Sequence, residues 1–310
     1  MIITAGRPGG QPCWSEPRTR FSARTLPMAA PDTGTGQVLR GRISPTCRDT
    51  LRVRLEQFAA RGDVTFAVVG LHRAAVHHQE ARAGAERSDP YPVVKAEAVA
   101  MELAWRVGLD VARTEVVEAL GHDVLLFDRF DRPEGGRHRR MVVSALTILS
   151  LDLTMARYAT YYDLADAIRS RFTEPRQTLR ELFSRIVFSI CVSNTDDHAR
   201  NHAAFWDGKI LTLTRAYDIC PQLRSGGEAT QVMAIRRDGY RYSQLAGCVA
   251  AATETYLLSN AEAKDVIDHQ VDTIRSEWDE AAEVARLTAV ERDQLWGRQI
   301  LNPHALEDAA

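Results

Sequence analysis

The sequence predicts an α+β fold with a small β-containing N-terminal part and a mainly α-helical C-terminal part. Runs of β-branched and aromatic residues flank a Gly-containing turn between positions 114 and 132, as in a β-hairpin. Apolar residues recur at helical spacing over most of the chain beyond residue 142. Two capping-box signatures, Ser259-x-x-Glu262 and Thr288-x-x-Glu291, mark further helix starts in the C-terminal third.

Composition places the chain among ordinary globular proteins. Its 310 residues are 45% apolar and 26% charged, which is enough for two lobes or domains. The formal charge of −2 argues against direct nucleic-acid binding and against an anionic membrane surface. No apolar run approaches the length of a membrane span, and the sequence does not open with a secretory pattern. Five scattered cysteines without a Cys-x-x-Cys pair indicate a reducing compartment, so we expect a cytoplasmic protein.

The N-terminal region, residues 1–87, carries no recognisable motif. Residues 1–48 are rich in Gly, Pro, Ser, Thr and Arg and are expected to be poorly ordered. A helix around 51–60 and a strand over 64–69 follow. The residue pattern changes at Ser88, where we place the start of the first well-defined element.

A helix is predicted from about Tyr91, with Pro92 in its first turn and Gly108 as its C-terminal stop. Glu97 falls on the apolar face of this helix. A carboxylate in that position requires a cation, although a glutamate that reaches the surface would give the same pattern. After this helix, segments 114–120 and 124–132 flank Gly121-His122-Asp123 and predict the hairpin.

The C-terminal part is predicted to be mainly helical. The run 142–149 is apolar, and a helical pattern then leads to a central helix that should end near Ser193. The two capping boxes open further helices, whose Trp278 and Trp296 are candidates for the core. The apolar positions of the earlier pattern are Tyr158, Tyr161, Leu164, Ile168 and Phe172, and those of the central helix are Leu179, Phe183, Ile186, Val187 and Ile190.

Polar side chains are concentrated in the eight residues 194–201, directly after the central helix. A strand at 203–206, an Asp207-Gly208 turn and a strand at 210–214 should form a hairpin that returns the chain to a second acidic turn, 216–221. Such a hairpin would bring Asn201 and Asp218 beside each other.

Asp196, Asn201 five residues later and Asp218 after a short hairpin form the arrangement that a kinase-like phosphotransferase needs. One carboxylate orients the attacking hydroxyl, while an amide and a second carboxylate hold Mg²⁺ against the phosphates of ATP. Asp197 is the more structural member of the acidic pair. Two other interpretations stay open: a plain helix-terminal turn, in which Asn and Asp bond their own backbone, and a zinc site on His198 and His202.

The sequence Asp-Asp-His-Ala-Arg-Asn-His at 196–202, followed by Ala-Tyr-Asp-Ile-Cys-Pro at 216–221, resembles the catalytic and metal loops of the HipA family. Members of this family are serine/threonine kinase toxins of bacterial toxin–antitoxin modules. The resemblance implies a protein-kinase-like two-lobe fold with a reduced β-containing N-lobe and a mainly α-helical C-lobe. The roles it implies are catalysis for Asp196, His198 and Arg200, and metal binding for Asn201 and Asp218.

The resemblance extends to Arg-Phe-Asp-Arg at 129–132, which is similar to the family's segment between the lobes. It implies that Phe130 and Asp128 line the nucleotide site, with Glu97 as the partner of a phosphate-binding lysine. An Arg–Asp alternation could also be a ribbon of salt bridges without a ligand. The implied organisation is a divergent N-terminal region at 1–87, an N-lobe remnant at 88–132 and a helical C-lobe at 133–310.

The resemblance implies ATP and Mg²⁺ as cofactors, a protein substrate, and a cognate DNA-binding antitoxin as partner. It stops before Ser88, because residues 80–86 contain neither the glycine-rich phosphate loop nor the lysine strand of the family. No lysine precedes Lys95, which lies two residues from Glu97 and therefore on a different helix face. Two alternatives to a kinase toxin follow: a catalytically impaired pseudokinase or fragment that acts by binding a partner, and a metal-dependent hydrolase.

Overall fold

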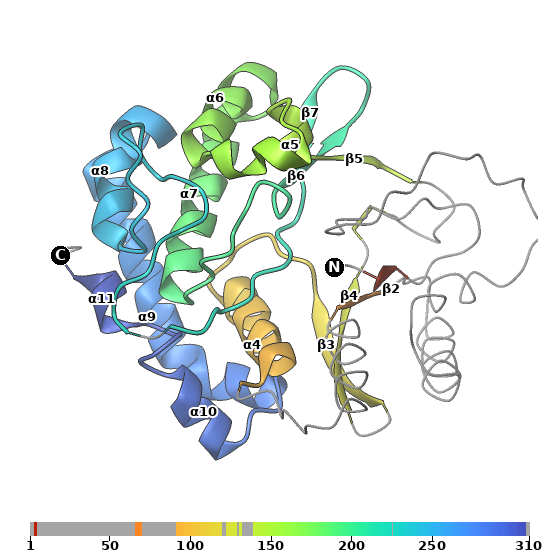
Figure 1. The fold of residues 1–310 in the computed structure, drawn as a ribbon, viewed down its shortest axis with the longest axis vertical. Helices are drawn as coiled ribbons and strands as arrows, with labels where there is room; N and C mark the ends of the chain where they lie inside the picture. Colours follow the sequence, from red (N-terminus) through yellow and green to blue (C-terminus); the bar gives the residue numbers. More distant parts are fainter. Residues whose placement is uncertain are drawn as a thin grey trace, which may run out of the picture. The chain divides into compact units, whose positions relative to one another are not determined.

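The computed structural model describes residues 3–4, 66–69, 91–119, 122–128, 130–131, 139–224 and 226–307 (Figure 1). The chain forms two compact units, which are described separately: residues 1–90 with 114–139, and residues 91–113 with 140–310. The predicted helix at 51–60, the phosphate-loop region at 80–86 and most of residues 1–48 lie outside the described residues.

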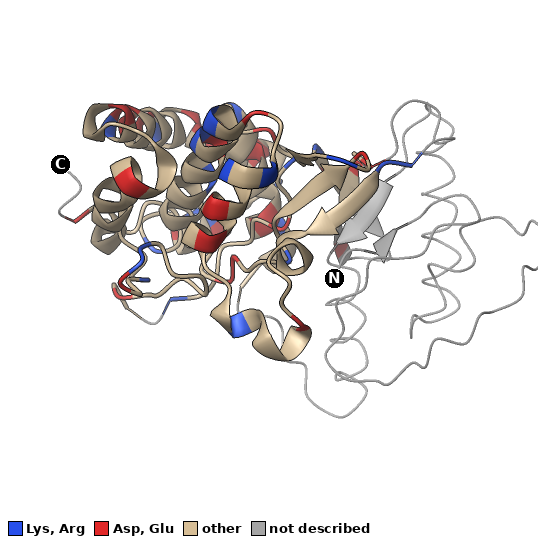
Figure 2. Ribbon diagram, turned by 90° about the horizontal axis from the view of Figure 1, so that it is seen from above, with Lys and Arg blue, Asp and Glu red and all other residues tan. Residues whose placement is uncertain are grey.

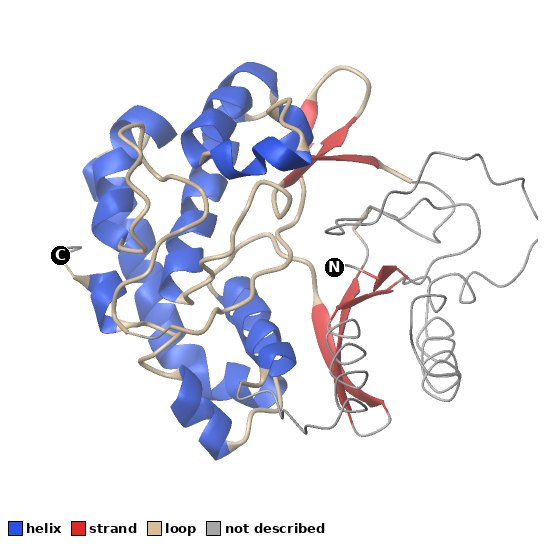
Figure 3. Ribbon diagram, viewed as in Figure 1, coloured by secondary structure: helices blue, strands red, loops and turns tan. Residues whose placement is uncertain are grey.

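The first unit contains an antiparallel sheet with the strand order β1-β2-β4-β3 (Figure 3). Its strands are β1 (Ile3–Thr4), β2 (Phe66–Val69), β3 (Thr114–Ala119) and β4 (His122–Asp128). The predicted hairpin is therefore confirmed, as is the strand at 64–69 over its last four residues.

The sheet also departs from the sequence prediction at its ends. The ladder of the hairpin continues to the pair Ala119–His122, so His122 and Asp123 belong to β4 and not to the turn. The strand ends at Asp128, earlier than the predicted 132. β1 was not predicted, because two residues are too few to show a period.

The second unit is mainly helical, and α7 is its centre (Figure 1). α7 packs against α6, α8 and α9, and α4 packs against α9. Every predicted apolar position of α7 is fully buried, as expected for a helix surrounded by others. The helices are α4 (Val93–Arg106), α5 (Ala145–Ile148), the 3₁₀ helix η1 (Leu153–Tyr158), α6 (Tyr161–Arg171), α7 (Pro175–Cys191), α8 (Leu245–Tyr256), α9 (Asn260–Val284), α10 (Ala289–Leu295) and α11 (Pro303–Leu306).

A second antiparallel sheet, of order β5-β6-β7, lies in the helical unit. Its strands are β5 (Met141–Ser144), β6 (Ala203–Trp206) and β7 (Leu211–Leu213). The predicted hairpin after the polar loop is confirmed: Asp207 accepts hydrogen bonds from the backbone N–H groups of Lys209 and Ile210, both at 2.8 Å. β5 was not predicted. The apolar run 142–149 divides at Ser144, whose side chain caps α5.

Both predicted capping boxes are present, at Ser259 and Thr288. Trp278 is buried, as predicted for the core, but the same prediction was wrong for Trp296, which is 38% exposed. Because α10 ends at Leu295, Trp296 leaves the helical pattern and its ring lies on that of Trp278, with 5.1 Å between centroids. Tyr158 likewise leaves the helical pattern: it ends η1 and is 52% exposed.

Charged residues of both signs are interspersed along the helices of this unit, which agrees with the formal charge of −2 (Figure 2).

In the described part of the chain, no helix combines the length and the apolar character needed to cross a bilayer. Cys191, Cys220 and Cys248 are buried free cysteines.

Gly108 ends α4 in a left-handed conformation, with φ of +85°. The N–H of Gly108 bonds Trp105 O and that of Leu109 bonds Ala104 O, each at 3.0 Å, which is the Schellman pattern. A Cβ atom at this position would meet nothing within 4 Å, so only the backbone conformation opposes a side chain.

We therefore expect Gly108→Ala to lower the free energy of unfolding by about 1 kcal/mol, the cost of the left-handed conformation for an L-residue. Denaturant unfolding followed by circular dichroism measures this change. Gly226→Ala, at a glycine with similar open space but without a positive φ, is the control and should change stability by less. Equal losses of stability in the two variants would show that the left-handed conformation of Gly108 is not the cause.

Candidate active site

The polar loop begins where α7 ends in a second Schellman motif. Asn194 N–H donates to Ser189 O at 2.7 Å and Ser193 N–H to Ile190 O at 3.2 Å. Ser193 takes the left-handed position, with φ of +54°, where glycine is more usual. Its hydroxyl donates to Gln299 O at 2.7 Å, so side-chain bonding stabilises the sharp exit of the chain.

Asp197 anchors the loop inside the protein. The residue is 4% exposed, and its Oδ2 accepts a 2.7 Å hydrogen bond from the Tyr161 hydroxyl on α6. Oδ1 lies 3.0 Å from Nε2 of the buried His202, whose ring meets that of Tyr161 edge-on. Ser189 of α7 adds a hydroxyl at 3.4 Å. These contacts agree with the structural role expected for Asp197.

The anchor keeps Asp197 ionised. Burial opposes ionisation, but the His202 imidazole and the Tyr161 hydroxyl hold the pKa of Asp197 below its ordinary value of 3.8. Burial and the same carboxylate raise the pKa of Tyr161 well above 10.0, so its phenol stays protonated and donates. The sequence pattern did not distinguish Tyr161 from the other apolar positions of α6, although a buried tyrosine hydroxyl has to find a partner.

The residues on either side of Asp197 differ in exposure. Asp196 is exposed, whereas Asn201 is 9% exposed and lies at the end of the loop. His198 and Arg200 are half-buried. Within the described residues, Nδ1 of His198 and Nε of Arg200 are buried atoms without a hydrogen-bond partner. The loop thus presents one free carboxylate to solvent and keeps two nitrogen donors or acceptors uncommitted.

The β6–β7 hairpin returns the chain to Asp218, as predicted. Asp218 is half-buried and has a φ of +60°, in the left-handed region that aspartate tolerates better than most residues. Non-glycine residues in that region often occur at functional sites, where the surrounding structure holds them.

Hydrogen bonds, one of them from a side chain, connect the two polar loops directly. The Tyr217 hydroxyl donates to Arg200 O at 2.8 Å, so it joins the residues adjacent to Asp218 and Asn201. Gln222 N–H donates to Ser193 O at 2.9 Å, and Val232 N–H to Thr195 O at 3.1 Å. Both loops are therefore held as one assembly.

α4 is bonded to the second acidic turn at both of its ends. Tyr91 donates its hydroxyl to Pro221 O at 3.2 Å near the start of α4, and Ala216 N–H donates to Asp110 O at 2.7 Å just beyond its end. Glu97 lies between these ends and is 4% exposed. Lys95 lies 3.2 Å from both carboxylate oxygens of Glu291 on α10, in agreement with a different face of the helix.

The remaining predicted residues belong to the sheet unit. Asp128 is the last residue of β4, opposite Phe66, and Phe130 follows in a turn; both are half-buried. Arg129 and Arg132 of the same motif lie outside the described residues, as does Arg82.

The donor set suits Mg²⁺ better than zinc. Asn201 and Asp218 offer an amide and a carboxylate oxygen from bonded loops, and Mg²⁺ in nucleotide sites uses few protein oxygens beside phosphates and water. For zinc, no group of three His, Cys, Asp or Glu residues suited to a metal occurs in the part of the chain that the structure describes. His202 faces Asp197 in the anchor.

A family model described as the HipA-like C-terminal domain matches residues 79–278. The two antiparallel sheets and the helices define an α+β protein. The chain belongs to the family of the HipA-like C-terminal domain. Among curated proteins, it is 28% identical over 131 residues to "Putative kinase Y4mE" of Sinorhizobium fredii, over 40% of this chain and 31% of that protein.

One solved structure shows a similar fold. A chain of the Shewanella oneidensis complex of HipA, HipB and operator DNA matches with a TM-score of 0.56 and 17% identity, over 69% of this chain and 57% of that chain. The Helicobacter pylori proinflammatory kinase CtkA matches with a TM-score of 0.45 and 14% identity, over 75% of this chain and 92% of that one. The chain thus spans less than a third of Y4mE and little more than half of the Shewanella chain.

The anchor makes stability depend on pH. Because the folded pKa of Asp197 is depressed, its contribution is present above the unfolded value near 3.8 and is lost as pH falls through the lower folded value. Tyr161→Phe removes one donor, and should lower the free energy of unfolding at pH 7 by about 1.5–3 kcal/mol, the range for bonds to charged groups. The difference from wild type should shrink below pH 4, as measured by urea unfolding.

Tyr162→Phe is the matched control, because the neighbouring hydroxyl forms no hydrogen bond with the described residues. It should leave stability nearly unchanged at both pH values. A pH-independent loss in Tyr161→Phe would show that packing, not the carboxylate bond, explains the effect.

Proposed function

We propose that the chain is a HipA-like serine/threonine protein kinase, the toxin of a toxin–antitoxin module, which transfers the γ-phosphate of ATP to a protein hydroxyl. One observation carries the proposal: the loop with Asp196 and Asn201 is bonded to the turn with Asp218 through Tyr217 and Arg200. Membership of the family supports it, as does the likeness to Y4mE, whose printed name is that of a kinase.

In this proposal, Asp196 accepts the proton of the substrate hydroxyl. Its exposure suits a group that has to reach a protein substrate, while Asp197 below it fixes the loop. His198 and Arg200 are proposed to assist at the transferred phosphoryl group, because each keeps an uncommitted nitrogen. Glu97, buried on α4, is proposed as the partner of a phosphate-binding cation.

Asn201 and Asp218 are proposed to hold Mg²⁺, which would neutralise charge on the ATP phosphates when bound. Asp128 and Phe130, in the sheet unit, are proposed to contact the nucleotide base. Positioning supplies most of the rate enhancement in phosphoryl transfer, so the bonded loops matter as much as the side chains.

The proposed partner is a cognate DNA-binding antitoxin. Its basis is the Shewanella structure, in which HipA occurs with HipB and operator DNA. Contact with DNA would then be made by the partner, which fits the formal charge of −2 on this chain. A cytoplasmic location is proposed on the same basis.

We expect Asp196→Asn and Asp218→Asn each to reduce transfer of labelled γ-phosphate from ATP to the chain itself or to casein by about 100-fold or more, the scale of lost acid–base or metal assistance. Asp268→Asn, which removes an exposed carboxylate on α9, should retain wild-type transfer. Unchanged melting temperatures would show that the variants are folded. Equal transfer by all four proteins would refute the assignment.

A pseudokinase or fragment that acts by binding a partner is the second candidate, and a specific observation favours it. Lys95 is bound to Glu291, and no lysine precedes it in the sequence. The other two lysines, Lys209 and Lys264, lie on the β6–β7 turn and on α9. A nucleotide site without the family's lysine would bind the triphosphate weakly and align it poorly.

A thermal-shift titration separates the two candidates. If ATP and Mg²⁺ bind as in a kinase, a concentration of 100 Kd adds about 2.7 kcal/mol of stability and raises Tm by roughly 5–10 °C. Asp218→Asn should abolish the Mg²⁺-dependent part of the shift, while Asp268→Asn should keep it. No shift in the wild type, together with a Mg²⁺-independent antitoxin complex, would select the pseudokinase.

A further inference from the structure

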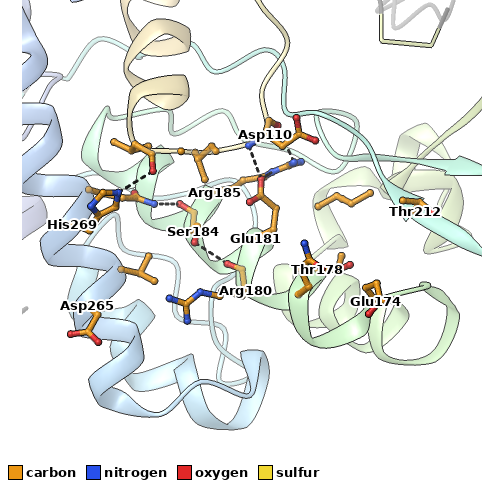
Figure 4. A pocket seen from close by; sticks show the side chains of 17 residues that line it. Asp110, Glu174, Thr178, Arg180, Glu181, Ser184, Arg185, Thr212, Asp265 and His269 are labelled. Atoms are coloured by element: carbon orange, nitrogen blue, oxygen red, sulfur yellow. Dashed lines mark hydrogen bonds and ion pairs between the residues drawn. The ribbon is translucent and has the colours of Figure 1, made fainter. Parts of the chain in front are cut away.

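The helical unit contains a half-open cavity of about 540 Å³ that none of the proposed kinase residues lines. Its walls are the segment after α4, one face of α7, part of β7 and one face of α9 (Figure 4). A volume of this size is typical of small-molecule sites.

Carboxylates dominate the charged lining of the cavity. Asp110, Glu174, Glu181 and Asp265 stand against the guanidinium groups of Arg180 and Arg185. Figure 4 shows Glu174 and Asp265 on opposite sides of the view, with Arg180 between them. The acidic groups are therefore spaced around the cavity instead of gathered at one point.

The two basic groups differ in their commitments. Arg185 is 4% exposed; its Nε bonds Glu181 at 2.8 Å, and its Nη2 bonds Thr214 O at 2.9 Å and Asp110 O at 3.2 Å. Arg185 is thus bonded to other residues of the protein and has a structural role in the cavity wall. Arg180 is exposed and forms no salt bridge with the described residues.

Two acidic groups at the opening, Glu174 and Asp265, also lack an ion-pair partner among the described residues. Both are exposed and therefore accessible to a ligand.

A buried acceptor gives a second, independent sign of a ligand. Gln270 on α9 lines the cavity and is 2% exposed; its Nε2 donates to Ser184 O at 2.9 Å. Its Oε1 is buried without a hydrogen-bond partner in the described structure. Buried acceptors are rarely left unsatisfied, so this oxygen calls for a donor from the cavity.

His269 adds a further acceptor at the same wall. Its Nε2 lies 3.2 Å from Val107 O, and a carbonyl can only accept, so Nε2 carries the proton. In this tautomer of the ring, Nδ1 is an acceptor. The uncommitted groups of the cavity are therefore mostly acceptors, and their charges are mostly negative.

We propose that this cavity binds a small organic polycation with several N–H donors, of the polyamine type. A metal ion fits less well, because no three suitable ligands are grouped in the described part of the chain. Spaced ammonium groups match the spaced carboxylates, and an N–H donor satisfies Gln270 Oε1. The ligand acts at a site separate from Asp196, Asn201 and Asp218, so its binding does not depend on the proposed kinase activity.

Calorimetric titration of the full chain with spermidine, at constant ionic strength and without nucleotide, tests the site. Glu174→Gln and Asp265→Asn should each weaken binding about fivefold, the upper end for partly exposed ion pairs. Gln270→Met, which keeps the volume but removes the acceptor, should also weaken binding. The melting temperature of each variant checks its folding.

The opposite effect on spermidine affinity is expected at Arg180. Arg180→Gln removes a positive charge that repels the positively charged ligand, and it should strengthen spermidine binding by up to about fivefold. Asp268 is on α9 next to His269 but does not line the cavity, so Asp268→Asn should leave spermidine binding unchanged. Weaker spermidine binding by Arg180→Gln would overturn the proposal, and so would equal losses of affinity in Asp265→Asn and Asp268→Asn. The proposal also fails if titration with MgCl₂ gives the same heat of binding as titration with spermidine.

Discussion

The buried carboxylate of Asp197 is the interaction on which the rest of the candidate site depends. A charged group that is 4% exposed is stable only when donors surround it, and here they come from three directions: Tyr161 on α6, Ser189 on α7 and His202 at the end of the polar loop. The loop therefore cannot move without breaking bonds to a buried charge. Its neighbour Asp196 is exposed, yet it is attached to a rigid support.

Hydrogen bonds from side chains and backbone extend this rigidity to the second loop. The β6–β7 hairpin separates Asn201 from Asp218 in the chain and folds back on itself. The hydrogen bond from the Tyr217 hydroxyl to Arg200 O then joins the two ends of the hairpin segment. α4 holds the acidic turn from both of its ends, through Tyr91 and Asp110. Left-handed residues occur at Ser193 and Asp218, where the chain has to turn sharply between these bonds. The site is thus assembled from loops, but each loop is fixed by the helices around it.

α7, α9 and the segment after α4 line the acidic cavity. Arg185 bonds both Asp110 O and Thr214 O, so a single buried guanidinium connects the cavity wall with the segments that lead to Asp218. Buried atoms without a hydrogen-bond partner occur in both places: among the described residues they include Nδ1 of His198 and His202 and Nε of Arg200 in or beside the polar loop, and Oε1 of Gln270 at the cavity.

The sequence by itself determined the α+β class, the hairpin of β3 and β4, the hairpin of β6 and β7, the end of α7 and both capping boxes. These features depend on neighbours within a few residues, through side-chain alternation, turn residues and local hydrogen bonds. The family resemblance rested on the two polar motifs, and the match over residues 79–278 confirms it.

Only the tertiary structure decided features that depend on distant partners. It divided the run 142–149 into β5 and α5, because β6 is available to pair with Met141–Ser144. It exposed Trp296 after α10 ended, and it chose Tyr161 as the partner of Asp197 across 36 residues. The acidic cavity likewise joins segments far apart in the chain. Periodicity reports which side of an element is apolar, but packing decides which buried polar groups meet and which stay open to a ligand.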